Sequence, residues 1–322
     1  MQGWVANTHA EWFDFLRERR DRWEEVNFWT PSDYAGFSGR PGVPFFFKLK
    51  SPRNRIGGFG LVSRYARLPE WLAWECFGEA NGAPDISLMT RRLEQLRASN
   101  RMKGREQKGP PQIGCVLLSD AVFFPEDMWV AQPTDWAPEI VRYKRYDLTV
   151  GEGLRVWREC QERLQSLRLG RVGDAVMMRE PGQDGLFATA RYGTPQLVAP
   201  RLGQGIFRVA VMDAYGRACS VTGEHSLPAL EAAHIKPYAL HGSHDVRNGL
   251  LLRSDLHRLY DTGYVTVTPE YRLEVSNRLR ADYSNGKSYY PMHGQSIGLP
   301  KRTQERPDPD LLAWHNERVF RE

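Results

Sequence analysis

At 322 residues the chain is longer than one average hydrophobic core, so about two domains are expected. Hydrophobic residues make up 41% of it and charged residues 26%, which excludes a mostly disordered or collagen-like protein. The net charge of +5 is too small to identify a polyanionic partner unless the charge is unevenly placed.

The absence of a membrane span or signal peptide and the spacing of the cysteines exclude further classes of protein. No stretch approaches the roughly 18 consecutive apolar residues of a membrane span, and residues 1–10 lack the basic and then apolar pattern of a signal peptide. We therefore expect a cytoplasmic protein with no membrane partner. The four cysteines are scattered without a Cys-x2-Cys pair, which indicates neither a disulfide framework nor a zinc knuckle. Cys219, like the others, is expected to be a reduced, packed thiol.

The first half of the chain predicts a mixture of strands and short helices. In chain order these are a helix at 11–22, strands at 44–50 and 56–64 joined by a turn at 51–54, helices at 68–77 and 85–97, a strand at 113–119 and a helix at 151–167. Asp85 is expected to cap the helix that follows it. The fold class is therefore α+β, with the first module forming a small curved barrel.

Basic residues are concentrated in this first half. Residues 34–69 hold seven basic and no acidic side chains, and residues 91–108 hold seven basic against two acidic. A solvated surface is the simpler explanation of one such run, but two runs interleaved with aromatic residues favour contacts with a phosphate backbone. The candidate backbone contacts are Lys48, Lys50, Arg53, Arg55, Arg101, Lys103 and Arg105.

Tryptophan and histidine divide the chain into two parts. Nine of the ten tryptophans lie in the first 157 residues, whereas five of the eight histidines lie between His225 and His257. Residues 180–204 are repeatedly interrupted by Gly and Pro, as is typical of a connection. We predict a first domain at 1–170, a linker at 171–205 and a second domain at 206–322.

The histidine-rich part contains the most specific pattern. A short apolar strand ends in His234, a loop follows that brings in Asn248, and a short helix follows that loop. Ser254 is expected to cap this helix and Gly263 to end it. His257 and Asp261 are four residues apart, so their side chains emerge on one helix face and can share a cation.

This arrangement resembles the ββα-metal, or HNH, nucleases. The matching motifs are Cys-Ser-Val-Thr-Gly at 219–223, Ala-Ala-His-Ile-Lys-Pro at 232–237, and a tail at 307–315 like that of these nucleases. The resemblance implies that His234 is the general base, that Asn248 holds the loop and orients that histidine, and that His257 and Asp261 bind Mg²⁺ or Mn²⁺. A neutral imidazole can take a proton from water near pH 7, and a cation stabilises the charge at the phosphate.

One position departs from the HNH pattern, and three other histidines stay open. Many HNH nucleases have an acidic residue or a second histidine where Ala233 stands here. Either two protein ligands and waters suffice, or Glu231, on the same strand face, contributes. His225, His241 and His244, taken singly, are more often structural than functional, although His241 and His244 can contact phosphate from their loop.

The opening of the chain resembles the EVE domains of the PUA superfamily. Phe-Trp-Thr-Pro-Ser-Asp-Tyr at 28–34, the Pro-Gly turn and Phe-rich strand at 41–48, and the Gly-rich return strand at 56–62 carry this resemblance. It implies a pocket that holds a flipped base by stacking and by hydrogen bonds to its edge. The candidate pocket residues are Trp29, Ser32, Asp33, Tyr34, Trp71 and Trp74.

An EVE-like module joined to an HNH nuclease resembles the modification-dependent (type IV) restriction endonucleases. The resemblance implies that the partner is double-stranded DNA carrying 5-hydroxymethylcytosine or 5-methylcytosine, with Asp33 accepting from the cytosine 4-amino group. One HNH site per chain is consistent with a homodimer on DNA. The alternatives are an HNH nuclease without modification dependence and a reader of modified nucleic acid that does not cut.

Overall fold

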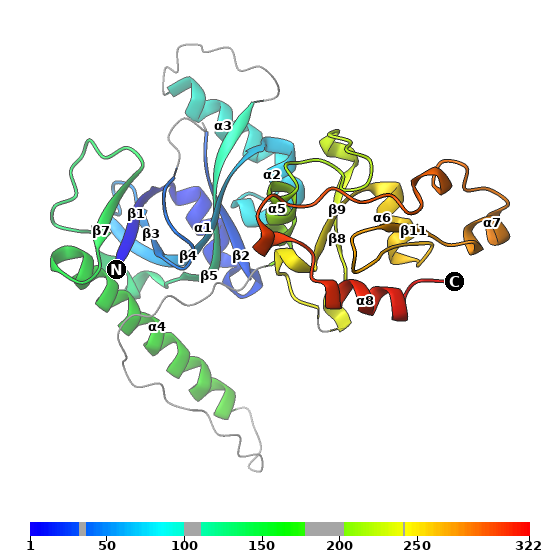
Figure 1. Ribbon diagram of the computed structural model, residues 1–322. Helices are drawn as coiled ribbons and strands as arrows, with labels where there is room; N and C mark the ends of the chain where they lie inside the picture. The colour runs from blue at the N-terminus through cyan, green and yellow to red at the C-terminus, as the bar shows by residue number, and fades with distance from the viewer. Residues whose placement is uncertain (32–36, 100–110, 178–202, 241) are drawn as a thin grey trace. The chain divides into compact units, whose positions relative to one another are not determined.

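The computed structural model describes residues 1–31, 37–99, 111–177, 203–240 and 242–322. The chain divides into two compact units, Met1–Arg201 and Leu202–Glu322, both of which mix helices and strands (Figure 1). Most of the predicted linker lies outside the described residues, so the predicted domain boundaries stay a prediction. Among the described helices, none is long and apolar enough to cross a membrane.

The first unit is built on one seven-stranded sheet. Its strands run in the order β2-β5-β4-β3-β1-β7, with β6 paired to β4. Their bounds are β1 Gln2–Thr8, β2 Glu25–Thr30, β3 Pro44–Leu49, β4 Arg55–Pro69, β5 Gln112–Phe123, β6 Val130–Ala131 and β7 Tyr143–Asp147. Only the β1–β3 pair is parallel among these ladders. No ladder joins β2 to β7 within the described residues, so closure of the predicted barrel is not shown.

The predicted hairpin at 44–64 is confirmed, but its second strand is longer than predicted. Strands β3 and β4 pair antiparallel across the turn at 51–54. Strand β4 continues to Pro69, where it pairs with Gln112, and Leu68 is buried there. The predicted strand ended at residue 64 and the predicted helix began at residue 68, because the sequence does not reveal that β5 lies beside residues 65–69. The short strands β1, β2, β6 and β7 were also not predicted.

Four helices accompany this sheet, and each was predicted with different bounds. They are α1 Ala10–Glu18, α2 Glu70–Phe77, α3 Ile86–Ser99 and α4 Gly151–Met177. The predicted cap of α3 is confirmed, since the Asp85 carboxylate accepts from the backbone N–H of Leu88 at 2.8 Å. Helix α1 ends before Arg22 and is followed by a single 3-10 turn. Helix α4 extends ten residues beyond the predicted end at 167.

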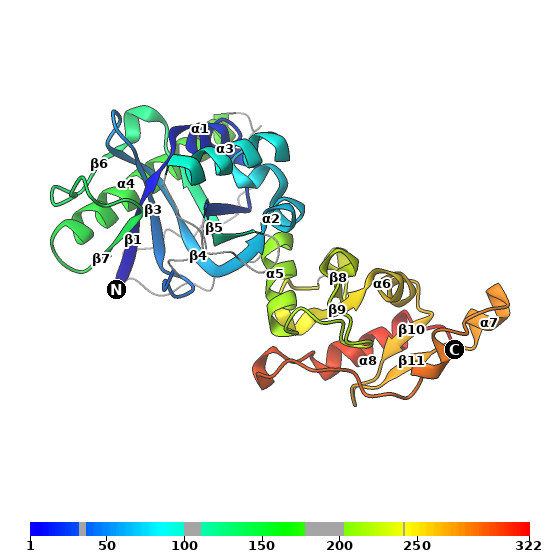
Figure 2. The same ribbon diagram turned by 90° about the horizontal axis from the view of Figure 1, so that it is seen from above.

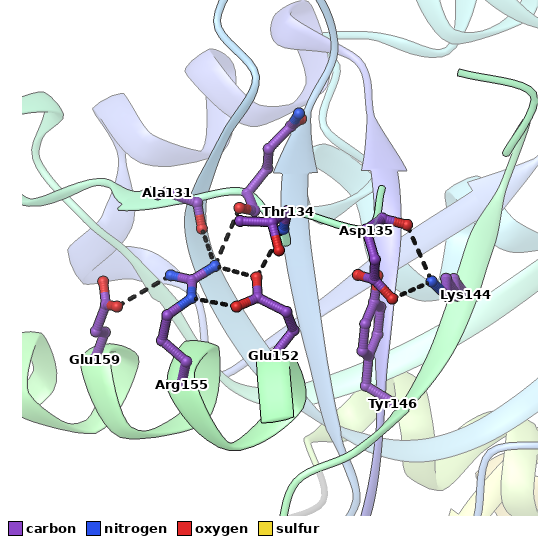
Figure 3. Close-up of polar contacts among 9 residues, drawn as sticks. Ala131, Thr134, Asp135, Lys144, Tyr146, Glu152, Arg155 and Glu159 are labelled. Carbon is purple, nitrogen blue, oxygen red and sulfur yellow. Dashed lines mark hydrogen bonds and ion pairs between the residues drawn. The ribbon is translucent and has the colours of Figure 1, made fainter. Parts of the chain in front are cut away.

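Arg155 anchors α4 to the segment between β6 and β7 (Figure 3). Its guanidinium donates to both oxygens of Glu152, at 3.0 and 2.8 Å, and to Glu159 at 3.0 Å. It also donates to the carbonyl of Gln132 at 3.1 Å, and Glu152 accepts from the backbone N–H of Thr134 at 2.7 Å. These charge-assisted bonds join the first turns of α4 to the segment after β6.

Most of the aromatic surplus of the first unit lies in its core. Trp12, Phe45, Phe47 and Phe123 are buried, and the rings of Phe47 and Phe123 stack 5.3 Å apart. The buried Trp12 indole donates to the carbonyl of Asn27 at 3.2 Å. Such rings contribute buried area and edge-to-face contacts, so the tryptophan count by itself does not identify a binding site.

The second unit contains the predicted strand, loop and helix. Strands β8 (Leu230–His234) and β9 (Gly249–Arg253) pair antiparallel and lead directly into α6 (Ser254–Asp261), as Figure 2 shows. Helix α5 (Gln204–Ala214) packs on both strands. The remaining elements are β10 Val265–Val267, β11 Leu273–Val275, α7 Arg278–Tyr283 and α8 Pro309–Arg318.

The ends of α6 confirm one prediction and correct another. Ser254 is the first helical residue and makes no capping hydrogen bond, because Arg253 occupies the N-cap position. Gly263 does follow the helix, with φ +76°, and a Cβ there would lie 2.0 Å from the carbonyl oxygen of Val319. A glycine is therefore required both by the left-handed backbone and by the close approach of the C-terminal segment.

Candidate functional site

His234 lies at the end of β8 in a partly buried position. Its ring stacks on the buried Phe207 of α5, with ring centroids 3.9 Å apart and an interplanar angle of 13°. Burial, together with the nearby imidazoles of His244 and His257, lowers its pKa to about 4. His234 is therefore neutral at neutral pH, as a general base must be.

His244 forms a hydrogen bond with one nitrogen of the His234 ring. Its Nδ1 lies 3.1 Å from His234 Nε2, and its own ring stacks on Tyr238 with centroids 4.5 Å apart. When Nε2 of His234 carries the proton and donates to His244, the lone pair lies on Nδ1. That Nδ1 forms no hydrogen bond to any described residue. The sequence predicted at most a phosphate contact for His244, since nothing in its spacing indicates this pairing.

Asn248 is fully buried and fastens the loop that follows His234. Its Oδ1 accepts from the backbone N–H of Lys236 at 2.9 Å, and its Nδ2 donates to the carbonyls of Lys236 and Ser243 at 2.9 and 2.8 Å. Its own carbonyl accepts from the N–H of Ile235 at 2.9 Å. All of these contacts are with backbone, so any effect of Asn248 on the His234 ring passes through the chain at 235–236 or through Ser243, which precedes His244.

Gly249 faces His234 across the β8–β9 ladder and lets α5 approach closely. A Cβ at this position would lie 2.4 Å from Cγ2 of Val211 and 3.1 Å from the ring of Phe207. The missing side chain therefore allows Phe207 to reach the position where it stacks on His234. This is a packing reason for glycine, because its backbone lies in an ordinary extended region with φ −129°.

His257 lies between two carboxylates from different elements. On α6, Asp261 Oδ2 is 3.3 Å from His257 Nε2, which confirms that these two side chains share a helix face. From β8, Glu231 Oε2 is 2.6 Å from His257 Nδ1. The two ring nitrogens point in opposite directions, so the two carboxylates lie at opposite edges of the imidazole.

This geometry decides how the three side chains could serve a metal ion. No group of three or more His, Cys, Asp and Glu side chains converges to hold an ion within the described residues. His257 Nε2 and Asp261 can share one ion, while Glu231 orients the ring through Nδ1, as carboxylates commonly do for metal-bound histidines. One imidazole and one carboxylate suit Mg²⁺ or Mn²⁺ completed by water. Burial and the Glu231 carboxylate raise the pKa of Asp261, against the effect of His257, so a cation would be stabilised there.

A pocket of about 520 Å³ opens in the first unit. Its wall combines aromatic rings, three strong cations and one acidic residue. The side chains that matter for a ligand are Trp12, Phe28, Trp29, Tyr143, His9, Lys50, Arg92, Arg142 and Glu11. Flat rings beside positive charge suit a nucleotide, which has an aromatic base and an anionic phosphate.

Three polar side chains of this pocket have fixed positions. The Lys50 ammonium lies 2.7 Å from His9 Nε2, and burial lowers the pKa of both groups. His9 therefore accepts from Lys50 as a neutral ring. The Trp29 indole donates to the carbonyl of Asn81 at 2.8 Å, which fixes the plane of that ring. The Oδ1 of Asn7, also in the lining, is buried without a hydrogen-bond partner among the described residues.

The predicted pocket residues are not all brought together. Trp29 lines the pocket, whereas Trp71 and Trp74, which lie on α2, are absent from its lining. Ser32, Asp33 and Tyr34 lie outside the described residues, immediately after the Thr30 and Pro31 that do line it. His9 and Arg142 were missed, since each depends on a strand, β1 or β7, that the sequence did not predict.

The residues predicted to contact the DNA phosphate backbone are also only partly placed where such contacts are possible. Lys48 is only 4% exposed, and its ammonium donates to Asn54 at 3.2 Å, which speaks against a phosphate contact. Arg53 is paired with both oxygens of Asp14 at 2.8 Å. Lys50 lies in the pocket, and Arg55 is exposed. Arg101, Lys103 and Arg105 lie outside the described residues.

Comparison with known proteins identifies the class of the second unit. Residues 219–268, which contain β8, β9 and α6, match the HNH endonuclease family. The chain thus carries an HNH endonuclease domain in its C-terminal half, and this supports a nuclease, and hence hydrolase, activity. HNH nucleases generally depend on a divalent metal.

The remaining comparisons do not identify a particular protein. No curated protein matches the chain. Three crystal structures of an ASCH protein from Zymomonas mobilis are similar to part of this chain: those of two of its mutants and one named without a mutation. Each match covers 51% of this chain, and the matches cover 97%, 95% and 94% of the respective ASCH chains. Their identities are 10%, 10% and 12%, and their TM-scores are 0.30, 0.29 and 0.27. At such similarity they support no conclusion about ligand or activity.

Proposed function

We propose that this protein is a metal-dependent DNA endonuclease directed to modified cytosine, as in modification-dependent restriction. The observation that carries the nuclease part is the geometry around His234. A neutral imidazole whose Nδ1 forms no hydrogen bond to a described residue lies in a ββα unit that also holds the His257–Asp261 pair. That unit lies within the stretch that matches the HNH endonuclease family.

In the proposed reaction His234 Nδ1 takes a proton from a water molecule, which attacks the scissile phosphate. His244 accepts from Nε2 and keeps the proton off Nδ1, and Asn248 fixes the loop that carries both histidines. His257 and Asp261 would hold a divalent ion, with Glu231 fixing the ring of His257. The bound ion would supply charge stabilisation for the phosphate and the departing 3′ oxygen.

The pocket of the first unit is the proposed reader of the modified base. A flipped 5-hydroxymethylcytosine or 5-methylcytosine would stack on rings such as Trp29, with its phosphates near the cations of the wall. Asp33 follows the pocket segment in sequence and is proposed to accept from the cytosine 4-amino group. The EVE-like, PUA-superfamily character of this unit is part of the same proposal. A homodimer on DNA would bring two HNH sites to the two strands.

Substitution of the base tests the nuclease part directly. His234→Ala is expected to lower the rate of DNA cleavage by about 10²- to 10⁴-fold with Mg²⁺ or Mn²⁺, because a general base contributes about that much. Binding of the same DNA should be unchanged. His225→Ala is the matched control, since His225 contacts only the carbonyl of Arg217 in the second unit. A wild-type protein that binds modified DNA but cuts none with any divalent metal would instead be a non-cleaving reader.

A further inference from the structure

A second cavity, in the HNH unit, lies outside the site described above. Its volume is about 460 Å³, and it lies between α6 and the segment that contains α7. Its walls are formed by Arg258, Leu259, Thr262, Tyr264, Leu279, Tyr283, Asn285, Gly286, Lys287, Ser288 and Tyr289. We call this the α6–α7 groove. None of its walls is formed by an acidic side chain, so its charge is positive.

Two cations of the groove are not neutralised. Arg258 and Lys287 are exposed, and neither side chain forms a hydrogen bond or ion pair with a described residue. Nearby arginines behave differently: Arg253 is bonded to both oxygens of Asp255 at 2.7 Å, and Arg278 pairs with Asp282 at 3.3 Å. Exposed, unpaired cations facing one groove are what an anionic ligand requires.

The groove also presents a flat aromatic surface. Tyr283 is 63% exposed, and its ring lies edge-on to Tyr264 with centroids 5.5 Å apart. The Tyr264 hydroxyl donates to Asp282 at 3.0 Å and the Tyr289 hydroxyl to Asp255 at 3.1 Å, and both of these aspartates are also paired with arginines. An exposed ring between cations can stack on a base or pack on a sugar.

The groove and the catalytic side chains share helix α6. Arg258 directly follows His257, so it emerges about 100° around the helix axis and about 1.5 Å along it. A DNA strand held at His257 therefore has the Arg258 cation on the adjacent residue of the same helix. A phosphodiester chain has repeated negative charges and flat bases, which match the two cations and Tyr283.

We propose that the α6–α7 groove binds the sugar–phosphate backbone of the DNA strand next to the scissile phosphate. Arg258 and Lys287 contact successive phosphates, and Tyr283 packs on a sugar or base between them. This inference rests on the proposed nuclease function. It assigns a DNA contact to the HNH unit, in addition to those predicted for the basic runs of the first unit.

Salt dependence of DNA binding tests the groove. The probe is a fluorescein-labelled duplex carrying 5-hydroxymethylcytosine, and the parent protein is the His234→Ala variant, whose cleavage is expected to be about 10²- to 10⁴-fold slower. Adding Arg258→Gln or Lys287→Gln is expected to weaken binding about five-fold at low salt and to reduce the slope of log K against log salt by about 0.9 each. Adding Tyr283→Leu should weaken binding without changing that slope. Lys301→Gln, at an exposed lysine outside the groove, should change neither.

The outcomes separate this proposal from the nuclease proposal. Salt slopes and affinities equal to those of the parent protein in all three groove variants would overturn the groove. Wild-type protein from the same preparation is tested for cleavage of the same duplex. Reduced salt slopes without cleavage by the wild-type protein would support the groove proposal and contradict the nuclease proposal. Cleavage with unchanged slopes would contradict the groove proposal alone. No binding by the parent protein would contradict both.

Discussion

The contact between His234 and His244 links the chemistry of the site to one hydrogen bond. Burial already keeps His234 neutral, with a pKa of about 4, but a neutral imidazole has two tautomers. Only the tautomer with its proton on Nε2 leaves Nδ1 able to accept a proton from water. His244 Nδ1, at 3.1 Å, selects that tautomer when it acts as the acceptor.

Substitution of His244 should therefore impair cleavage through His234. His244→Ala is expected to lower kcat about ten-fold, the equivalent of one hydrogen bond, with little change in KM. His244→Asn should recover much of the loss, because its amide oxygen can take the position of Nδ1. Nitrogen-15 NMR of the imidazoles would report the His234 tautomer independently of activity. Equal rates in the alanine and asparagine variants would count against this role.

The site could be predicted from sequence only where spacing along one element decides the geometry. The i, i+4 spacing of His257 and Asp261 correctly placed both side chains on one face of a helix. The approach of His244 to His234 depends on the irregular loop between them, for which no periodicity exists. The prediction that Lys48 lies at the surface was wrong for a related reason. Lys48 lies in β3, a strand buried on both faces, so the alternation of inward and outward side chains along a strand does not indicate which of them are exposed.

At the scale of elements, the packing of α5 against β9 supports the base. Phe207 of α5 can stack on His234 because Gly249 has no side chain. The same glycine follows Asn248, so the loop and the helix contact are adjacent in sequence. Substitutions at this contact are therefore expected to affect the position of the His234 ring.

Gly249→Ala is expected to move α5 away from His234. A Cβ 2.4 Å from Val211 and 3.1 Å from the Phe207 ring overpacks the interface, at a cost of about 1–3 kcal/mol in the free energy of unfolding. Cleavage should fall at the same time, because Phe207 no longer fixes the imidazole. Urea unfolding and initial cleavage rates measure the two effects. Gly294→Ala is a useful comparison, since that glycine has positive φ but no neighbour within 4 Å of the added Cβ. A Gly249→Ala protein with wild-type stability and rate would contradict the account.

The docking of α8 depends on a buried, neutral histidine. His315 is 2% exposed, its Nδ1 lies 2.9 Å from the Thr266 hydroxyl, and its Nε2 donates to the carbonyl of Tyr260 at 3.2 Å. Burial lowers its pKa to about 4. The ring also stacks on Tyr260, with centroids 3.7 Å apart.

Acid should therefore destabilise the second unit. The unfolded histidine binds a proton below about pH 6.5, whereas folded His315 stays neutral down to about pH 4, so unfolding takes up a proton in that window. The contribution of His315 is fully present above pH 6.5 and is lost toward pH 4, by on the order of 3 kcal/mol. Urea unfolding at pH 7.5 and 4.5 should show a smaller loss in His315→Asn than in the wild type. An equal loss of unfolding free energy in both proteins would contradict this role of His315.

At the scale of the whole molecule, the net charge of +5 conceals two different uses of basic residues. In the first unit, Lys48 is buried and Arg53 is paired with Asp14, so the basic run at 34–69 is less available to DNA than its sequence suggests. Lys50 contributes instead to the pocket. In the second unit, Arg258 and Lys287 are exposed without such partners among the described residues.

The two units differ in how far sequence alone could describe them. The ββα order of the HNH unit is local in sequence, and strand, loop and helix were predicted together. The sheet of the first unit joins strands that are far apart, such as β1 with β7, and the pocket is lined from both. Its lining could therefore be predicted only in part, with Trp29 found and His9 and Arg142 missed.

The most direct test of the central claim is a paired digestion of one DNA sequence. Duplexes that differ only in carrying cytosine, 5-methylcytosine or 5-hydroxymethylcytosine are incubated with the wild-type protein and with Mg²⁺ or Mn²⁺. We expect cleavage of at least one modified duplex and sparing of the unmodified one, with Trp29→Ala losing this preference while still containing an intact HNH site. Equal cleavage of all three duplexes by the wild-type protein would contradict the reading of modified cytosine.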